Sequence, residues 1–148
     1  MSSIKISQEE ADKLLGMLKY TLVSEIEFPQ KRASTEFKVI GDKKQDIFVI
    51  NLFRGNINRL KYNMGARIMK NGILLLELHM NPSNIHTNPD GEKITGSHWH
   101  IYSEEAGLLW AFPAEDLNSE QFVENTIIFL DKFNVIEKPE IRFQYELL

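Results

Sequence analysis

The sequence predicts an α+β fold, in which an antiparallel meander sheet of about five to seven strands packs against an N-terminal helix and a C-terminal helix. Three observations predict this class. Apolar residues repeat at helical spacing in one segment near each end of the chain. The residues between these segments alternate in polarity with a period of two. Short turn sequences separate the alternating segments, which is typical of consecutive antiparallel strands.

The first helix is predicted from about Ser7 to Val23. Ser7 and Glu10 have the spacing of a capping box, and apolar residues follow at helical intervals. The second helix is predicted over residues 119–133, with Asn118 or Ser119 as its cap and Asn134 closing it in a left-handed conformation. We expect the apolar faces of helices and central strands to be buried, in particular Leu14, Leu18, Ile50, Leu52, Leu76, Ile127 and Leu130.

Between the helices, the first predicted hairpin joins Thr35–Ile40 to Asp46–Arg54 through the turn at residues 41–44. The second arm is apolar on both faces, which predicts a central strand that is covered on both sides. A reversal at Arg54-Gly55-Asn56-Ile57 leads into a strand segment over residues 57–69.

Asn71-Gly72 is the strongest tight-hairpin signal in the chain, and the most apolar strand, Ile73–Leu78, follows it. Trp110, Phe112 and Pro113 indicate a further short strand or buried segment. A last strand over residues 141–145 is expected at a sheet edge.

The length, net charge and amino-acid composition of the chain restrict the classes of function. With 148 residues, we expect a single domain over residues 1–148. No apolar run approaches the ~20 residues of a membrane span, and the N-terminal residues carry no signal core, so we expect a cytoplasmic protein without membrane contact. A net charge of −4 argues against a broad electrostatic hold on nucleic acid. The absence of cysteine leaves histidine, carboxylate, hydroxyl and amine chemistry.

The stretch from His86 to Tyr102 holds three of the four histidines and most of the candidate functional residues. Its first part belongs to a loop over residues 80–97, and loops of this length inside compact domains are usually functional or disordered. Asn88-Pro89-Asp90-Gly91 predicts a reversal within it. From Ser97 onward, strand alternation places His98, His100 and Tyr102 on one face and the apolar Trp99 and Ile101 on the other.

Several segments carry a family resemblance that runs from end to end: SQEEADKLL, DIFVINLFRG, KYN, HTNPDGEKI, HWHIY, WAFP and FNVIEKP. Through them the chain resembles an uncharacterised family of small bacterial proteins, a domain of unknown function associated with phage and mobile-element neighbourhoods. The resemblance implies no established activity. The family positions matched here are His86, Asn88, Pro89, Asp90, Gly91, His98, His100, Tyr102 and Trp110.

This chain departs from the family pattern after Tyr102. Ser103-Glu104 stand where the family more often has Arg-Glu. An anion-holding role for that arginine is therefore not expected here.

Histidines on one strand face can serve as general acid and base without a large pKa shift, as metal-free ribonuclease chemistry requires. The hypothesis assigns His98 and His100 as acid and base, with His86 and Tyr102 assisting. Basic residues on neighbouring predicted strands would neutralise the phosphate, namely Arg54, Lys61 and Arg67. This hypothesis needs neither a metal nor a cofactor.

Two other interpretations of the same residues stay open. His98 and His100 can share a metal, with His86 and either Asp90 or Glu92 completing an N/O site, although such pairs are common without one. The histidines can also hold the loop to the sheet as a rigid clasp, with Asn88, Asp90 and Glu92 on the loop side.

Two hypotheses of function follow. The first is a phage- or mobile-element-associated, toxin-like, metal-independent endoribonuclease or phosphodiesterase that acts on RNA or a nucleotide. The second is a non-enzymatic protein that binds and inhibits a host-defence or phage component, in the manner of an anti-defence or anti-CRISPR inhibitor; an antitoxin or a defence nuclease would then be the partner. Its mild acidity suits binding to a basic protein surface.

Overall fold

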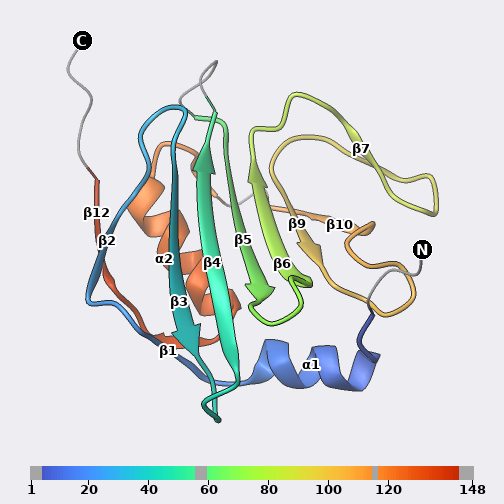
Figure 1. Cartoon of the computed structure of the whole chain (residues 1–148). Coiled ribbons are helices and arrows are strands. Elements are labelled where there is room, and N and C mark those ends of the chain that lie inside the picture. The colour runs from blue at the N-terminus through green and yellow to red at the C-terminus, as the bar shows by residue number, and fades with distance from the viewer. Residues whose placement is uncertain (1–4, 56–59, 115–116, 144–148) are drawn as a thin grey trace.

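The computed structural model describes residues 5–55, 60–114 and 117–143 (Figure 1). The helices are α1 (Gln8–Gly16) and α2 (Phe122–Lys132). The strands are β1 (Lys19–Thr21), β2 (Glu25–Glu27), β3 (Ser34–Ile40), β4 (Ile47–Arg54), β5 (Tyr62–Ile68), β6 (Leu74–Met80), β7 (His86–Thr87), β8 (Lys93–Ile94), β9 (His98–Ile101), β10 (Ala111–Pro113), β11 (Val135–Glu137) and β12 (Glu140–Arg142).

The main sheet has eight strands in the order β10-β9-β6-β5-β4-β3-β1-β11. Only the pairing of β1 with β11 is parallel within it, and β3 to β6 form the expected meander. The α+β class is confirmed, whereas the expected strand number of about five to seven was too low. Two small sheets, β12-β2 and β7-β8, account for the remaining strands in the described part of the chain.

Helix α2 covers one face of the sheet, and the hydrophobic core lies between them (Figure 1). Phe133 meets Phe48 of β4 edge to face at 5.3 Å between ring centroids, and Phe129 stacks on Trp99 of β9 at 6.1 Å. In Figure 1 no helix lies on the opposite face of β3 to β6. On that face of β4, Val49 is buried but Phe53 is 46% exposed, so the expected cover on both sides is only partial.

Helix α1 lies at one end of the strands and is shorter than predicted (Figure 1). The Ser7 cap is confirmed, because its Oγ accepts a hydrogen bond from the backbone N–H of Glu10 at 3.1 Å. The helix ends at Gly16, and the chain then joins the sheet as β1. Leu14 is buried as expected, but Leu18 is 49% exposed, since it lies beyond the helix that would have turned it inward.

Helix α2 also begins later than residue 119, at Phe122, because Asn118 caps a turn ahead of it by accepting from the backbone N–H of Glu120 at 2.9 Å. Asn134 adopts the expected left-handed conformation with φ of 61°. Leu130 is fully buried, whereas Ile127 is exposed, because only one side of α2 faces the sheet.

The remaining turn predictions have mixed outcomes. The Asn71-Gly72 hairpin is confirmed, and Gly72 has the positive φ of 76° that favours glycine. The last strand, β12, pairs with β2 in a separate parallel sheet rather than with the main sheet, and its predicted continuation to residues 144–145 lies outside the described residues. The predicted reversal at residues 54–57 also reaches undescribed residues.

The expected absence of a membrane span agrees with one finding. In the described ranges, neither helix is long and apolar enough to cross a bilayer.

Candidate functional site

Strand register brings two histidines that are far apart in the sequence side by side on the open face of the sheet. His79 of β6 pairs with His98 of β9, and Glu77 pairs with His100. Opposite residues of an antiparallel pair project to the same face, and their Cβ atoms lie about 4.5–5.5 Å apart. These four side chains therefore form one block on the face that α2 does not cover, near the β10 edge of the sheet.

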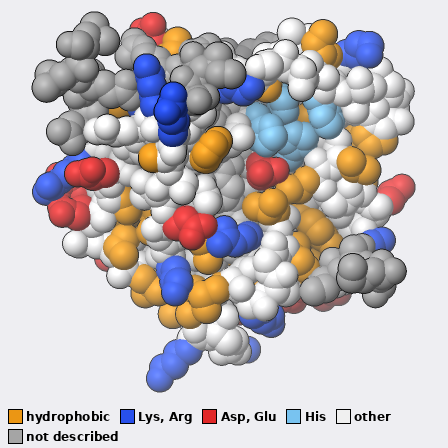
Figure 2. Space-filling view, turned by 45° about the horizontal axis from the view of Figure 1, so that its top comes forward, with side chains coloured by type: hydrophobic (Ala, Val, Ile, Leu, Met, Phe, Trp, Pro, Cys, Tyr) orange, Lys and Arg blue, Asp and Glu red, His pale blue; other side chains and the backbone are white. Residues whose placement is uncertain are grey.

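The fourth histidine reaches the block from the small β7-β8 sheet. The ring centroid of His86 lies 4.9 Å from that of His100 and 5.6 Å from that of His98. His79 lies 5.2 Å from His98 and 4.9 Å from His100 by the same measure. All four histidines of the chain thus form one cluster, which Figure 2 shows as a single pale blue patch on the surface.

Backbone carbonyls fix the tautomers of the central rings. The Nδ1 of His98 lies 2.9 Å from the carbonyl oxygen of Gly96, and the Nδ1 of His100 lies 2.6 Å from that of Leu108. Because a carbonyl oxygen only accepts hydrogen bonds, each Nδ1 carries the proton and donates. The Nε2 of each ring is left with its lone pair, and neither Nε2 has a hydrogen-bond partner among the described residues.

Burial lowers the pKa of both central histidines. His98 is 3% exposed and His100 is 6% exposed, and desolvation is the main cause of the shift in each. The hydrogen bond to the Gly96 carbonyl partly offsets the shift in His98, and the neighbouring His79 lowers the pKa of His100 further. Both rings are therefore neutral at neutral pH, which is the form that binds metal ions or accepts a proton.

The arrangement has the ligand composition of a metal centre. One ring nitrogen from each of His79, His98 and His100 lies within 4.8 Å of the other two. The carbonyl bonds at Nδ1 are the kind of second contact that orients metal-binding imidazoles in proteins. Glu77 adds a carboxylate at the margin, with its Oε1 3.6 Å from the Nε2 of His79.

The loop residues proposed as a clasp divide into two roles. Asn88 is buried and holds β10 by both amide atoms, because its Oδ1 accepts from the Ala111 N–H at 2.7 Å and its Nδ2 donates to the Ala111 carbonyl at 3.1 Å. Asp90 instead accepts from the backbone N–H of Glu92 at 2.9 Å within the turn. The loop is therefore held by Asn88 and by His86, whose Nε2 lies 2.8 Å from the carbonyl oxygen of Leu109. The carbonyls that orient the central histidines come from Gly96 and Leu108.

Two residues expected to assist catalysis are built into the fold elsewhere. The hydroxyl of Tyr102 donates to the carbonyl of Ile6 at 3.1 Å and accepts from its N–H at 3.1 Å. Arg54 is buried on the helix-covered side, donates from Nη1 to the carbonyl of Pro29 at 3.0 Å and lies 4.9 Å from the centroid of the Phe122 ring. Neither residue contacts the histidine cluster.

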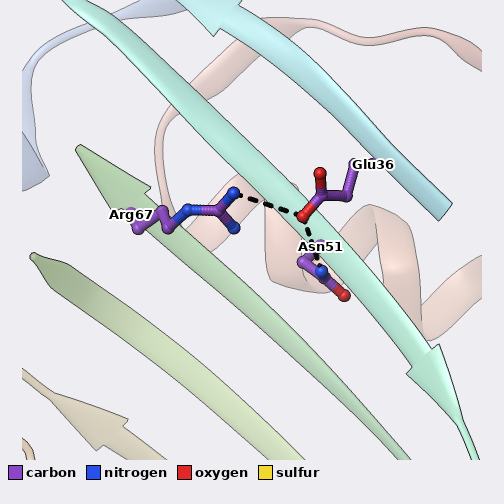
Figure 3. A network of polar contacts seen from close by, with 3 residues as sticks. All are labelled: Glu36, Asn51 and Arg67. Atoms are coloured by element: carbon purple, nitrogen blue, oxygen red, sulfur yellow. Dashed lines mark hydrogen bonds and ion pairs between the residues drawn. The ribbon is translucent and has the colours of Figure 1, made fainter. Parts of the chain in front are cut away.

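The other two basic residues lie outside the histidine cluster as well. Lys61 donates to the Ser83 hydroxyl at 2.6 Å. Arg67 projects onto the open face and forms an ion pair with Glu36 at 3.2 Å, and Asn51 donates to the same Glu36 oxygen at 2.8 Å (Figure 3). Of the three predicted phosphate ligands, Arg54 is buried on the helix-covered side, whereas Arg67 shares the open face with the histidines.

Prediction from the sequence missed His79, the residue that makes the cluster a three-ligand site. The available signal was the alternation in β6, where Glu77 and His79 occupy polar positions in an otherwise apolar strand. Nothing local to β6 indicates that His98 would lie opposite, because that depends on pairing between strands that are separated by a long loop.

A family model described as a family of unknown function, DUF6978, matches residues 6–135, which include every histidine and strands β1 to β10. The chain belongs to the DUF6978 family. The expectation of an uncharacterised domain family is therefore confirmed. No curated protein and no solved structure matches the chain. The DUF6978 match ends at Val135, before β12.

Proposed function

We propose that this DUF6978 protein is a metal-dependent hydrolase that holds a zinc-type divalent ion through His79, His98 and His100. The observation that carries the proposal is the convergence of three ring nitrogens within 4.8 Å of one another. In a tetrahedral zinc site with Zn–N distances of ~2.0–2.1 Å, ligand nitrogens lie roughly 3.3–3.4 Å apart. Binding would require the His79 side chain, which is 28% exposed, to rotate so that its ring nitrogen approaches those of His98 and His100.

The ring nitrogens of the cluster suit a cation. The Nδ1 atoms of His98 and His100 lie against carbonyl oxygens, so the Nε2 atom of each ring carries a lone pair. A metal ion would accept these lone pairs together with one from His79, whose ring nitrogen lies within 4.8 Å of a nitrogen of each central ring.

His79, His98 and His100 would hold the ion. A zinc ion there would supply Lewis-acid chemistry, since zinc lowers the pKa of a bound water to about 7. Glu77 flanks His79 and also lines a cavity on the open face, so its carboxylate is placed to accept a proton from an attacking water. These features fit hydrolysis of an ester or phosphoester.

A metal-independent phosphodiesterase is the second candidate function, and one observation favours it. Burial keeps His98 and His100 neutral, so either ring can act as a general base. The metal proposal has more support, because Arg54 and Lys61 are bonded elsewhere and leave the histidines without the predicted phosphate ligands. The phage setting and the inhibitor hypothesis stay predictions.

Calorimetric titration of chelator-stripped protein with Zn²⁺ tests the proposal. We expect one ion per chain and a loss of affinity of about 100-fold or more in His98→Ala and in His100→Ala. Glu92→Gln is the matched control, since this loop carboxylate was a candidate ligand from the sequence and is exposed. Binding that is absent, or unchanged in the histidine variants, would overturn the metal site.

An activity assay separates the two candidate functions. Cleavage of a chromogenic phosphodiester is expected only after Zn²⁺ is restored. Cleavage that persists in chelator and disappears in His100→Ala would support the metal-independent phosphodiesterase instead.

A further inference from the structure

A groove adjoins the histidine cluster on the open face of the sheet. Its volume is about 420 Å³, and its walls include Ser34, Asn51, Phe53, Asn63, Arg67 and Glu77. Glu77 belongs to both the groove and the histidine block, so a molecule in the groove lies against the proposed metal centre. A cavity of this size suits a small organic ligand.

The floor of the groove is formed by backbone at Gly65 of β5. This residue pairs with Asn51 on one side and with Glu77 on the other. A Cβ atom at this position would lie 3.4 Å from Cδ2 of Leu74 and 3.8 Å from Cγ of Glu77. Glycine therefore keeps the floor flat, and a large side chain at this position would fill the space.

An exposed aromatic ring stands on one side of this floor. Phe53 is 46% exposed although it lies on a central strand, and it pairs with Ser34 and Asn63 of the neighbouring strands. The side chain of Asn63 has no hydrogen-bond partner among the described residues. An amide carries two donor hydrogens and an acceptor oxygen, so the ring is adjoined by a group that can pair with the edge of a planar polar ligand.

The one arginine of the wall is paired with Glu36, which lies outside the residues that line the groove. Glu36 forms an ion pair with Arg67 and accepts from the Nδ2 of Asn51, which holds both side chains in place (Figure 3). The Oδ1 of Asn51 is left as an acceptor. Because the cation is already paired, this end of the groove suits a neutral heterocycle with hydrogen-bonding edges better than an anion.

We propose that the groove binds the base of a nucleotide, stacked on Phe53 and contacted by Asn51 and Asn63, and directs its phosphate toward the histidine cluster. This inference rests on the proposed function for the fate of the phosphate. Stacking on exposed aromatic residues of an open sheet, with polar side chains at the base edges, is how several small domains bind single-stranded nucleic acid. Phe53 and His79 lie two strands apart, which is ~9–10 Å at normal strand spacing and within the span of a nucleotide.

The charge of the chain limits the length of the ligand. A long strand is held mainly through its phosphates by many lysines and arginines. The net charge is −4, and the one arginine in the groove is paired, so a mononucleotide or a few linked nucleotides fit better than a long nucleic acid.

Binding to metal-stripped protein tests the inference separately from hydrolysis. The probes are the four ribonucleoside 5′-monophosphates, a trinucleotide and ribose 5-phosphate, which lacks a base. We expect at least one mononucleotide to bind and ribose 5-phosphate to bind far more weakly. Phe53→Ala should weaken binding about 10-fold or more, given the usual contribution of base stacking. Gly65→Leu should abolish binding by filling the groove.

Phe112→Ala is the matched control, because Phe112 is a 45% exposed aromatic residue that does not line the groove. Equal effects of the two phenylalanine substitutions, equal binding of ribose 5-phosphate, or no nucleotide binding would overturn the inference. Tighter binding of the trinucleotide than of any mononucleotide would show that the ligand is a short single-stranded nucleic acid. Loss of Zn²⁺ uptake in His98→Ala with nucleotide binding preserved would support the groove independently of the metal site. Nucleotide binding without any Zn²⁺ uptake would sustain the groove and defeat the metal proposal.

Discussion

Lys19 and the histidine cluster are both buried and polar, but their hydrogen-bonding capacity is used in different ways. The ammonium group of Lys19 donates to the carbonyls of Leu15 at 3.3 Å, Met17 at 2.9 Å and Phe133 at 2.7 Å. It also lies 3.8 Å from the centroid of the Phe133 ring. Its three N–H donors thus all have acceptors, and the residue ties the end of α1 to the end of α2.

In each of the two central histidines, only one of the two ring nitrogens forms a hydrogen bond with the described residues. Nδ1 of His98 and of His100 is bonded to a carbonyl, while Nε2 has no hydrogen-bond partner among the described residues. The difference separates structural from functional buried groups. A buried polar group with every donor satisfied stabilises the fold, whereas neighbouring neutral imidazoles that each keep a lone pair suit the binding of a cation.

The largest effect on stability is expected for a substitution of Lys19, because all three of its N–H donors have acceptors. Lys19→Met should lower the free energy of unfolding by about 3–5 kcal/mol, because it leaves buried carbonyls of Met17 and Phe133 without donors. Zn²⁺ uptake by the folded protein should be unchanged. Urea unfolding measures the first effect, and Lys13→Met, at an exposed position on α1, is the control. Equal stability of the two variants would show that the Lys19 contacts are not structural.

Asn88 links the structural hydrogen bonds to the histidine cluster. Both of its side-chain amide atoms are hydrogen-bonded, and it holds the loop that carries His86. Asn88→Ala removes two buried hydrogen bonds to Ala111 and should cost about 2–3 kcal/mol. It should also weaken Zn²⁺ binding, because the segment that supplies the Leu108 carbonyl precedes Ala111 directly. Thermal unfolding and calorimetric titration of the same samples test both parts. Loss of stability without loss of metal affinity would separate the loop from the site.

The pH dependence of metal-free protein tests the cluster directly. The pKa of His98 and of His100 is lowered in the folded state from the ordinary 6.5, so the unfolded chain binds more protons below that pH. The stabilisation is complete above about pH 6.5 and is lost as the pH falls toward the folded-state values. Urea midpoints measured from pH 8 to pH 5 should therefore decrease. The double variant His98→Gln, His100→Gln should show a flatter profile, and an identical profile would contradict the assignment.

The smallest effect on stability is expected for the ion pair between Arg67 of the groove wall and Glu36. Arg67 and Glu36 are both substantially exposed, with 32% and 48% of their side-chain surface accessible. Such surface pairs contribute about 0–1 kcal/mol, so Arg67→Met should leave the unfolding midpoint nearly unchanged. A loss comparable to that of Lys19→Met would mean that the open face is part of the structural core and not a binding surface.

The sequence predicted correctly those caps and turns that depend only on neighbouring residues. The Ser7 cap, the Asn71-Gly72 hairpin and the left-handed Asn134 follow from the chemistry of one or a few neighbouring residues. The strand period of two likewise predicted that His98 and His100 would share a face with Trp99 directed to the core, where Trp99 stacks on Phe129. The α+β class followed from the same periodicities.

Only the tertiary structure decided which of these residues meet. The register of β6 against β9 places His79 opposite His98, and the β7-β8 hairpin brings His86 to the same point. Burial of Leu18 failed because the pairing of β1 with β3 and β11 ended the helix early. Arg54 and Tyr102 became structural through contacts with distant backbone. Cross-strand pairing joins residues far apart in the chain, so its free energy depends on packing of the whole sheet and leaves no signature within a local window.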